Sequence, residues 1–125
     1  MDSQEIKTVI QAYFDAGYES SGEKMREVFH NVAHVYGQDK DGTLNDMDKE
    51  EFIKLVESGK SGTSKSDYPR QEEIISIDFT GEDTAVARVK LRVGDIMFTD
   101  VLGFIRLDSK WTIISKLYSG VPISN

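Results

Sequence analysis

Residues 98–118, FTDVLGFIRLDSKWTIISKLY, decide the expected fold because they contain the clearest strand pattern in the chain. On both sides of a short turn at 108–110, apolar residues recur at every second position, as in a strand with one buried face. The pattern predicts two strands, at 96–107 and 110–119, that pair as an antiparallel hairpin.

The chain before this hairpin contains the other expected elements. Two more segments of period two, at 72–80 and 85–93, extend the hairpin into an antiparallel meander of four strands. Further upstream, apolar residues at helical spacing predict a long first helix behind Ser3 and a short second helix. A third helix is predicted to begin at Asp48, because Glu51 follows it at the spacing of a capping box.

A short strand at 32–37 is expected between the last two helices, and a surface loop rich in Ser, Lys and Gly is expected at 60–70. Helices followed by an antiparallel sheet predict an α+β fold, in which three N-terminal helices pack on the concave face of a curved sheet. The length of 125 residues suits one domain, residues 1–125, with a hydrophobic core.

The composition argues against several classes of function. With 22 acidic and 15 basic residues, the chain has a net charge of -7 at pH 7, which repels nucleic acid and anionic membrane surfaces. No apolar run approaches the length of a membrane span, and the first residues do not resemble a signal peptide. The chain contains no cysteine, which excludes disulfides and thiolate chemistry. We expect a cytoplasmic protein that binds neither nucleic acid nor membranes.

The segment DKDGTL at 39–44 has part of the pattern of a calcium-binding loop. With Gly42 at the sixth loop position, however, Gly37 occupies the first ligand position and Asp48 replaces the glutamate expected at the twelfth. A turn at Asp41 and Gly42 after a strand explains the segment better. We therefore expect no metal site, and nothing in the sequence indicates a cofactor.

Asp100 and Lys116 are charged residues inside otherwise apolar strand patterns. Asp100 is expected to share a buried face with Phe98 and Phe104, where a carboxylate needs a partner. It either serves a ligand site as an acid or hydrogen-bonding group, or forms a structural ion pair with Lys116 of the neighbouring strand. Lys116 in turn either contacts an anionic or carbonyl ligand or only pairs with Asp100.

Aromatic residues and a histidine complete the predicted ligand site. Tyr13 lies on the apolar face of the first helix, where its hydroxyl either serves the site or packs in the core with a partner. His30 either faces the site or complements the dipole at the end of the second helix. No catalytic residue is assigned, and the predicted ligand-binding residues are Tyr13, Phe14, His30, Phe52, Phe98, Asp100, Lys116 and Tyr118.

Trp111, Ile113 and Leu117 are expected on the face of the last strand that is opposite Lys116. Apolar side chains on the outer side of a sheet need cover. A second subunit would supply that cover, which predicts a homodimer through the sheet. The alternative is packing against the C-terminal segment at 120–125.

The chain resembles the nuclear transport factor 2-like superfamily in the order of its elements and in several motifs. These are Tyr13, VFHNVAHVYG at 28–37, DGTL followed by EEFI, and the terminal pattern at 98–118. Within the superfamily, the chain is most similar to the group labelled "putative lumazine-binding" or SnoaL-like. The resemblance implies a cone-shaped, cystatin-like α+β barrel with a pocket at its open end, commonly in a homodimer.

Ketosteroid isomerase, an enzyme of this superfamily, implies roles for three positions. Tyr13, sixteen residues before Phe29, and Asp100, four residues before Phe104, match its two oxyanion-hole residues. Its general base would fall on Gly37, which has no group to accept a proton, so this chemistry is not expected. The superfamily hosts isomerases, dehydratases, cyclases and non-catalytic binding or interaction modules, so the fold alone does not decide the function.

We predict a protein that binds an unidentified small molecule in an apolar cone-shaped pocket bearing a few polar groups. Gly37 argues against the first alternative, an enzyme of the isomerase, dehydratase or cyclase type. The enclosed pair of Asp100 and Lys116 argues against the second alternative, a protein-interaction module with a vestigial pocket, unless that pair is purely structural.

Overall fold

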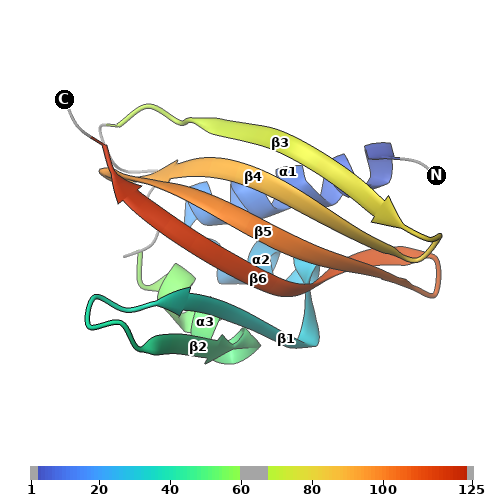
Figure 1. Ribbon diagram of the computed structural model, residues 1–125, viewed down its shortest axis with the longest axis horizontal. Coiled ribbons are helices and arrows are strands. Elements are labelled where there is room, and N and C mark those ends of the chain that lie inside the picture. The colour runs from blue at the N-terminus through green and yellow to red at the C-terminus, as the bar shows by residue number, and fades with distance from the viewer. Residues whose placement is uncertain (1–2, 60–67, 124–125) are drawn as a thin grey trace.

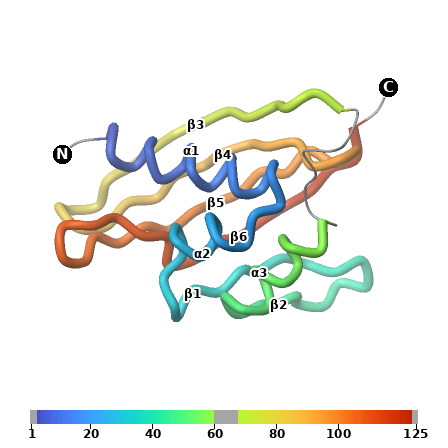
Figure 2. The backbone as a smooth tube through the Cα atoms, turned by 180° about the vertical axis from the view of Figure 1, so that it is seen from behind, coloured from blue at the N-terminus to red at the C-terminus, as the bar shows by residue number. Residues whose placement is uncertain are grey.

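The computed structural model describes residues 3–59 and 68–123. In chain order the elements are α1 (Ser3–Glu19), α2 (Gly22–Val28), β1 (Phe29–Gln38), β2 (Leu44–Asp48), α3 (Lys49–Glu57), β3 (Glu72–Thr80), β4 (Thr84–Val93), β5 (Ile96–Leu107) and β6 (Lys110–Pro122). The strands form one curved sheet in the order β2-β1-β6-β5-β4-β3. The helices lie together on one face of this sheet, as Figures 1 and 2 show from opposite sides. The α+β prediction is confirmed.

The predicted meander is also confirmed, because β3, β4, β5 and β6 pair with one another in sequence order and antiparallel. β1 then pairs with β6 in parallel and with β2 antiparallel. The parallel pairing places the N-terminal part of the chain against its last strand. Most of the loop predicted at 60–70 lies outside the described residues. None of the described helices has the length and apolar character that crossing a membrane would require.

β2 is a short edge strand that was not predicted from the sequence, because it lacks a continuous apolar face and begins with the exposed Leu44. The turn before it is the predicted one: Gly42 has a φ of 87°, and its amide donates to the carbonyl of Asp39 at 2.9 Å. The predicted capping box is present too. Asp48 Oδ1 accepts from the amide of Glu51 at 2.9 Å, and Glu51 Oε1 accepts from the amide of Asp48 at 3.0 Å.

β6 contains a β-bulge that breaks the strand period. Gly103 of β5 pairs with Ser115 of β6, whereas the next residue, Phe104, pairs with Ile113, so the register leaves out Ile114. Because side chains alternate between the two faces of a strand, one extra residue exchanges the faces on either side of the bulge. The first part of β6 therefore presents the opposite set of residues from the one that strict alternation predicts.

The bulge overturns the predicted dimer surface. Trp111 is 6% exposed and Ile113 is fully buried, and both belong to the hydrophobic core rather than to the outer face. Trp111 packs against Phe79 with the ring centroids 5.8 Å apart. The assignment of Trp111 and Ile113 to the outer face is therefore wrong. Leu117, beyond the bulge, is 54% exposed as predicted.

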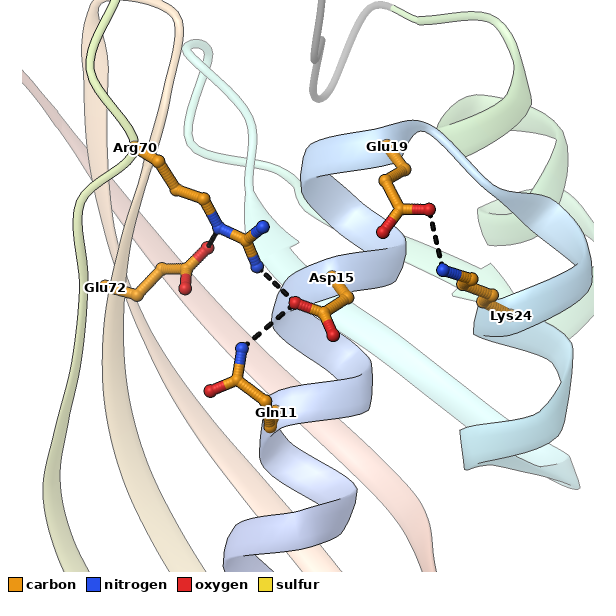
Figure 3. A network of polar contacts seen from close by, with 6 residues as sticks. All are labelled: Gln11, Asp15, Glu19, Lys24, Arg70 and Glu72. Atoms are coloured by element: carbon orange, nitrogen blue, oxygen red, sulfur yellow. Dashed lines mark hydrogen bonds and ion pairs between the residues drawn. The ribbon is translucent and has the colours of Figure 1, made fainter.

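Polar contacts on the surface attach α1 to its neighbours, as Figure 3 shows. The guanidinium of Arg70, just before β3, donates to Asp15 of α1 and, at 2.5 Å, to Glu72 at the start of β3. Lys24 of α2 pairs with Glu19 of α1 at 2.7 Å. Single exposed pairs contribute little, but a shared guanidinium links the helix to the sheet in a defined orientation. These contacts help to hold α1 over the inner face of the sheet.

Candidate functional site

A cavity of about 270 Å³ lies between the helices and the inner face of the sheet. Its wall is mostly apolar and includes residues from all three helices and from β1, β2, β4, β5 and β6. Side-chain polar groups enter this wall from four residues, which are Tyr13, Asp100, Lys116 and Tyr118. An apolar cavity with a few convergent polar groups is the usual form of a small-molecule site.

Six of the eight predicted ligand-site residues line the cavity, namely Tyr13, Phe52, Phe98, Asp100, Lys116 and Tyr118. Phe14 is not part of the wall; it is 3% exposed and packs in the core beside Tyr13. His30 is not part of it either. It lies in β1 rather than at a helix end, and its Nδ1 accepts a hydrogen bond of 3.2 Å from the amide of Val32. The positions of Phe14 and His30 differ from the prediction because adjacent residues of a helix or strand point in different directions.

Tyr13, Asp100 and Lys116 form a connected polar cluster at the cavity wall. The hydroxyl of Tyr13 donates a hydrogen bond of 2.5 Å to Asp100 Oδ2. Lys116 Nζ lies 3.8 Å from the same oxygen, which is close enough for an ion pair and too far for a hydrogen bond. The ion pair between Asp100 and Lys116, one of the two alternatives considered from the sequence, is therefore present. The carboxylate of Asp100 also accepts the hydrogen bond from Tyr13.

The second carboxylate oxygen of Asp100 is unusual. Asp100 is fully buried, and Oδ1 has no hydrogen-bond partner among the described residues. A buried acceptor without a partner costs about 1–3 kcal/mol, so most native proteins satisfy such atoms. Because Asp100 lines the cavity, a donor group of a bound molecule is one way to satisfy Oδ1.

Lys116 lies in a largely apolar and aromatic environment. Its Nζ is 4.5 Å from the ring centroid of Phe52 and 5.0 Å from that of Tyr13, so both rings contribute cation–π attraction. The residue is 8% exposed. The aromatic rings and the distant carboxylate only partly replace the water that this ammonium has lost.

Burial shifts the pKa values of two members of the cluster in opposite directions. Desolvation lowers the pKa of Lys116 from its usual value, and the attraction of Asp100 opposes that change without cancelling it. Desolvation also raises the pKa of Tyr13 well above its usual value, and the neighbouring charge of Asp100 raises it further. Both shifts favour the neutral forms, a phenol and an amine.

Tyr118 occupies the space beside Gly37, the position at which the isomerase resemblance places a general base. A Cβ atom on Gly37 would lie 2.1 Å from Cζ of Tyr118, so no larger side chain fits there without a shift of the ring. The hydroxyl of Tyr118 accepts a hydrogen bond of 2.8 Å from Asn45 Nδ2 of β2. The absence of a base at this position thus has a structural reason, namely the packing of a tyrosine ring in its place.

Much of the apolar wall was not predicted from the sequence. Apart from the six residues above, the cavity is lined by side chains that include Met25, Val35, Met47, Leu55, Leu91 and Ile96. Their apolar character is equally typical of core residues, and no pattern in the sequence separates a cavity wall from a filled core. The parallel pairing of β1 with β6 decides which of them meet, and local sequence does not reveal that pairing.

The described residues contain no group of three or more His, Cys, Asp or Glu side chains that could hold a metal ion. His34 Nδ1 lies 2.6 Å from Asp46 Oδ1 on the surface of the β1–β2 hairpin, away from the cavity. The hydrogen bond to Asp46 raises the pKa of His34 above its usual value.

A curved, mostly antiparallel sheet with helices on its inner face and a cavity between them defines a nuclear transport factor 2-like protein with a cystatin-like fold. The sequence profile of the family described as "Putative lumazine-binding" matches residues 1–119 of the chain. The chain belongs to this family, as the resemblance in its sequence predicted. Membership suggests a domain that binds a small molecule, and it identifies neither the ligand nor a reaction.

Solved bacterial structures share this fold. An NTF2-like protein from Shewanella baltica has a TM-score of 0.85 and 24% identity, over 95% of this chain and 93% of that one. An NTF2-like protein from Methylobacillus flagellatus has a TM-score of 0.80 and 29% identity, over 94% of this chain and 90% of that one. Among curated proteins, the aldolase FrzH of Cladobotryum sp is 25% identical over 116 residues, which cover 88% of this chain and 84% of that protein.

Proposed function

We propose that the protein binds a small, mostly apolar molecule in the cavity and anchors it through a hydrogen-bond donor at Asp100. The observation that carries this proposal is Asp100 of the cavity wall, whose buried Oδ1 has no hydrogen-bond partner among the described residues. A ligand with an N–H or O–H group supplies the missing hydrogen bond and removes the free-energy cost of the unpartnered acceptor. Ligands with such a group should therefore bind more tightly than ligands without one.

The size of the cavity supports a ligand of one or two rings. Its volume of about 270 Å³ is just below the usual range of ligand pockets, which begins at roughly 300 Å³. A cavity of about 150 Å³ suffices for benzene. The aromatic walls supplied by Phe52, Phe98 and Tyr118 suit a flat ring, and membership of the family supports ligand binding in general.

The experiment compares two probes of nearly equal shape, indole with its N–H group and indene without one. A ligand that binds only the folded state raises the melting temperature, and the rise depends on its affinity. We expect indole to raise the melting temperature more than indene does. The difference between the two probes should disappear in the double variant Asp100→Leu with Lys116→Met, which replaces the ion pair by apolar groups. It should persist in the control variant Asp78→Asn, because Asp78 is on the exposed side of β3.

Two outcomes contradict the proposal. If neither probe changes the melting temperature at its solubility limit, the cavity does not bind flat ring compounds. If both probes bind equally and the double variant binds them as the natural sequence does, the cavity binds apolar molecules and Asp100 has no part in the selection.

A second candidate function is chemistry on a carbonyl compound in the same cavity. Two observations favour it: the phenol, carboxylate and amine of Tyr13, Asp100 and Lys116 lie within one cluster, and one relative is named an aldolase. Such a cluster offers groups that donate and accept protons, which carbonyl reactions require. The arrangement at Gly37 and Tyr118 argues against the base-catalysed isomerisation considered from the sequence.

A further inference from the structure

We propose that Lys116 is a nucleophilic amine that forms an imine with an aldehyde or ketone bound in the cavity. This inference rests on the proposed function, because a carbonyl compound must first occupy the cavity. It goes further by naming the class of ligand and the atom that reacts with it. Three features of Lys116 support it, namely the position of Nζ, its protonation state and the groups around it.

The position of Lys116 distinguishes it from the other lysines. Among the described residues, Lys49 and Lys116 are the buried lysines, at 6% and 8% exposure. Lys49 Nζ donates a hydrogen bond of 3.1 Å to Asn31 Oδ1, and Lys49 is not part of the cavity wall. Lys116 lines the cavity, and its nearest carboxylate oxygen is 3.8 Å away, beyond hydrogen-bond distance.

The environment of Lys116 favours the neutral amine, which is the nucleophilic form. Burial lowers the pKa of Lys116, and burial is a larger effect than the opposing attraction of Asp100. Each unit by which a lysine pKa falls raises the neutral fraction at pH 7 about tenfold. A desolvated lysine in an apolar pocket is a known way to activate this side chain as a nucleophile.

The reaction is balanced without an additional reagent. The nitrogen lone pair of Lys116 forms a bond to the carbonyl carbon, the π electrons of the C=O bond move to oxygen, and a proton passes from nitrogen to that oxygen. The resulting carbinolamine then loses its hydroxyl group together with the remaining N–H proton as water, which leaves a C=N bond.

The neighbouring groups suit this sequence of steps. The carbinolamine hydroxyl is a hydrogen-bond donor, and Asp100 Oδ1 is a buried acceptor without a partner. The phenol of Tyr13 holds Asp100 Oδ2 at 2.5 Å and thereby fixes the carboxylate. The carboxylate is thus held with one oxygen free to accept from the intermediate, a role that a purely structural ion pair does not need.

Reductive trapping tests the inference. The protein is incubated at pH 7 with benzaldehyde and sodium cyanoborohydride, which delivers hydride to the imine carbon and leaves a stable secondary amine, and the products are mapped by peptide mass spectrometry. We expect one benzyl group on Lys116, at an occupancy about tenfold or more above that of any exposed lysine. Lys49 is the internal control for a buried lysine outside the cavity, and Lys49→Arg should leave the labelling of Lys116 unchanged.

Each result decides between the two proposals. Labelling confined to the α-amino group, Lys49 and exposed lysines overturns the role of Lys116. In that case, a larger rise in melting temperature with indole than with indene shows that the binding proposal stands and only the imine fails. The absence of both the labelling of Lys116 and the indole effect contradicts both proposals. Because the decisive map uses the natural sequence, it does not depend on whether a Lys116 variant folds.

Discussion

Tyr13 in α1 and Asp100 in β5 are 87 residues apart in the chain, and the tyrosine hydroxyl donates a hydrogen bond of 2.5 Å to the carboxylate. Both side chains are buried, at 1% and 0% exposure. The bond therefore links the helical layer to the sheet inside the core, next to a cavity. Since Asp100 also faces Lys116, a change in any of the three residues alters the environment of the other two.

Replacing Tyr13 by Phe removes the hydroxyl and keeps most of the ring packing. We expect the free energy of unfolding to fall by about 1.5–3 kcal/mol, because a hydrogen bond to a charged group is lost and Asp100 keeps no strong donor on either oxygen. Urea denaturation measures the change. A loss below about 0.5 kcal/mol would show that water or Lys116 readily replaces the phenol.

Replacing Asp100 by Asn removes the counter-charge whose attraction opposes the loss of a proton from Lys116. We expect a loss of about 3–5 kcal/mol in the free energy of unfolding at a pH below the lowered pKa of Lys116, where breaking one side of the buried pair leaves an uncompensated charge, and a smaller loss above it. The double change Asp100→Leu with Lys116→Met should recover most of that loss, because apolar residues of similar volume often replace a buried pair without cost. A double variant less stable than Asp100→Asn would contradict this view of the pair.

The raised pKa of Tyr13 makes stability depend on pH in the alkaline range. Its neutral form is favoured in the folded state, so the contribution of Tyr13 is fully present below the unfolded pKa of 10.0 and is lost as pH rises through the higher folded pKa. We expect the stability difference between the natural sequence and Tyr13→Phe to shrink above pH 10. The pKa of Lys116 is lowered, so its contribution to stability changes with pH in the opposite direction. Because Lys116 is present in both proteins, this contribution largely cancels in the difference between them.

Spectroscopy offers a direct measurement of the same group. The chain has five tyrosines, and their ionisation changes the ultraviolet absorbance. We expect the absorbance change of one tyrosine to be delayed until the protein unfolds, and this delayed step to be missing in Tyr13→Phe. Complete ionisation of all tyrosines near pH 10 in a folded sample would contradict the burial of Tyr13.

Gly37 and Gly17 form a matched pair for testing how closely Tyr118 packs. A Cβ on Gly37 would meet the Tyr118 ring at 2.1 Å, so Gly37→Ala should destabilise by about 1–3 kcal/mol. A Cβ on Gly17 would lie 4.0 Å from Leu91, and the residue is inside α1, so Gly17→Ala should stabilise by about 0.5–1 kcal/mol. Thermal or urea unfolding distinguishes the two. Equal effects would mean that the Tyr118 ring moves aside easily.

The bulge in β6 can be tested with Ile113 and Leu117. Ile113 is fully buried, so Ile113→Ala should cost about 2–5 kcal/mol, whereas Leu117→Ala on the exposed face should change stability by no more than about 0.5 kcal/mol. Strict alternation without a bulge would put both residues on one face and give similar effects. Similar measured losses would therefore contradict the register described for β5 and β6.

The sequence by itself determined the class of fold, and it predicted the polar members of the candidate site. The period-two pattern of the last four strands, the helical spacing of α1 and the capping box at Asp48 are local signals, because side-chain direction and backbone hydrogen bonding are set by neighbours in the chain. Asp100 and Lys116 could be identified because a charge in an apolar strand costs energy unless it has a partner or a role.

Only the tertiary structure decided the faces of β6, the cavity and the distances within the cluster. The bulge at Ile114 moved Trp111 and Ile113 into the core, and no residue in the sequence marks that insertion. The parallel contact of β1 with β6 brought Gly37 and Tyr118 together, and the packing of α1 on the sheet brought Tyr13 to Asp100. Contacts between residues so far apart in the chain depend on how whole elements pack, because packing energy belongs to the assembled core and not to any local segment.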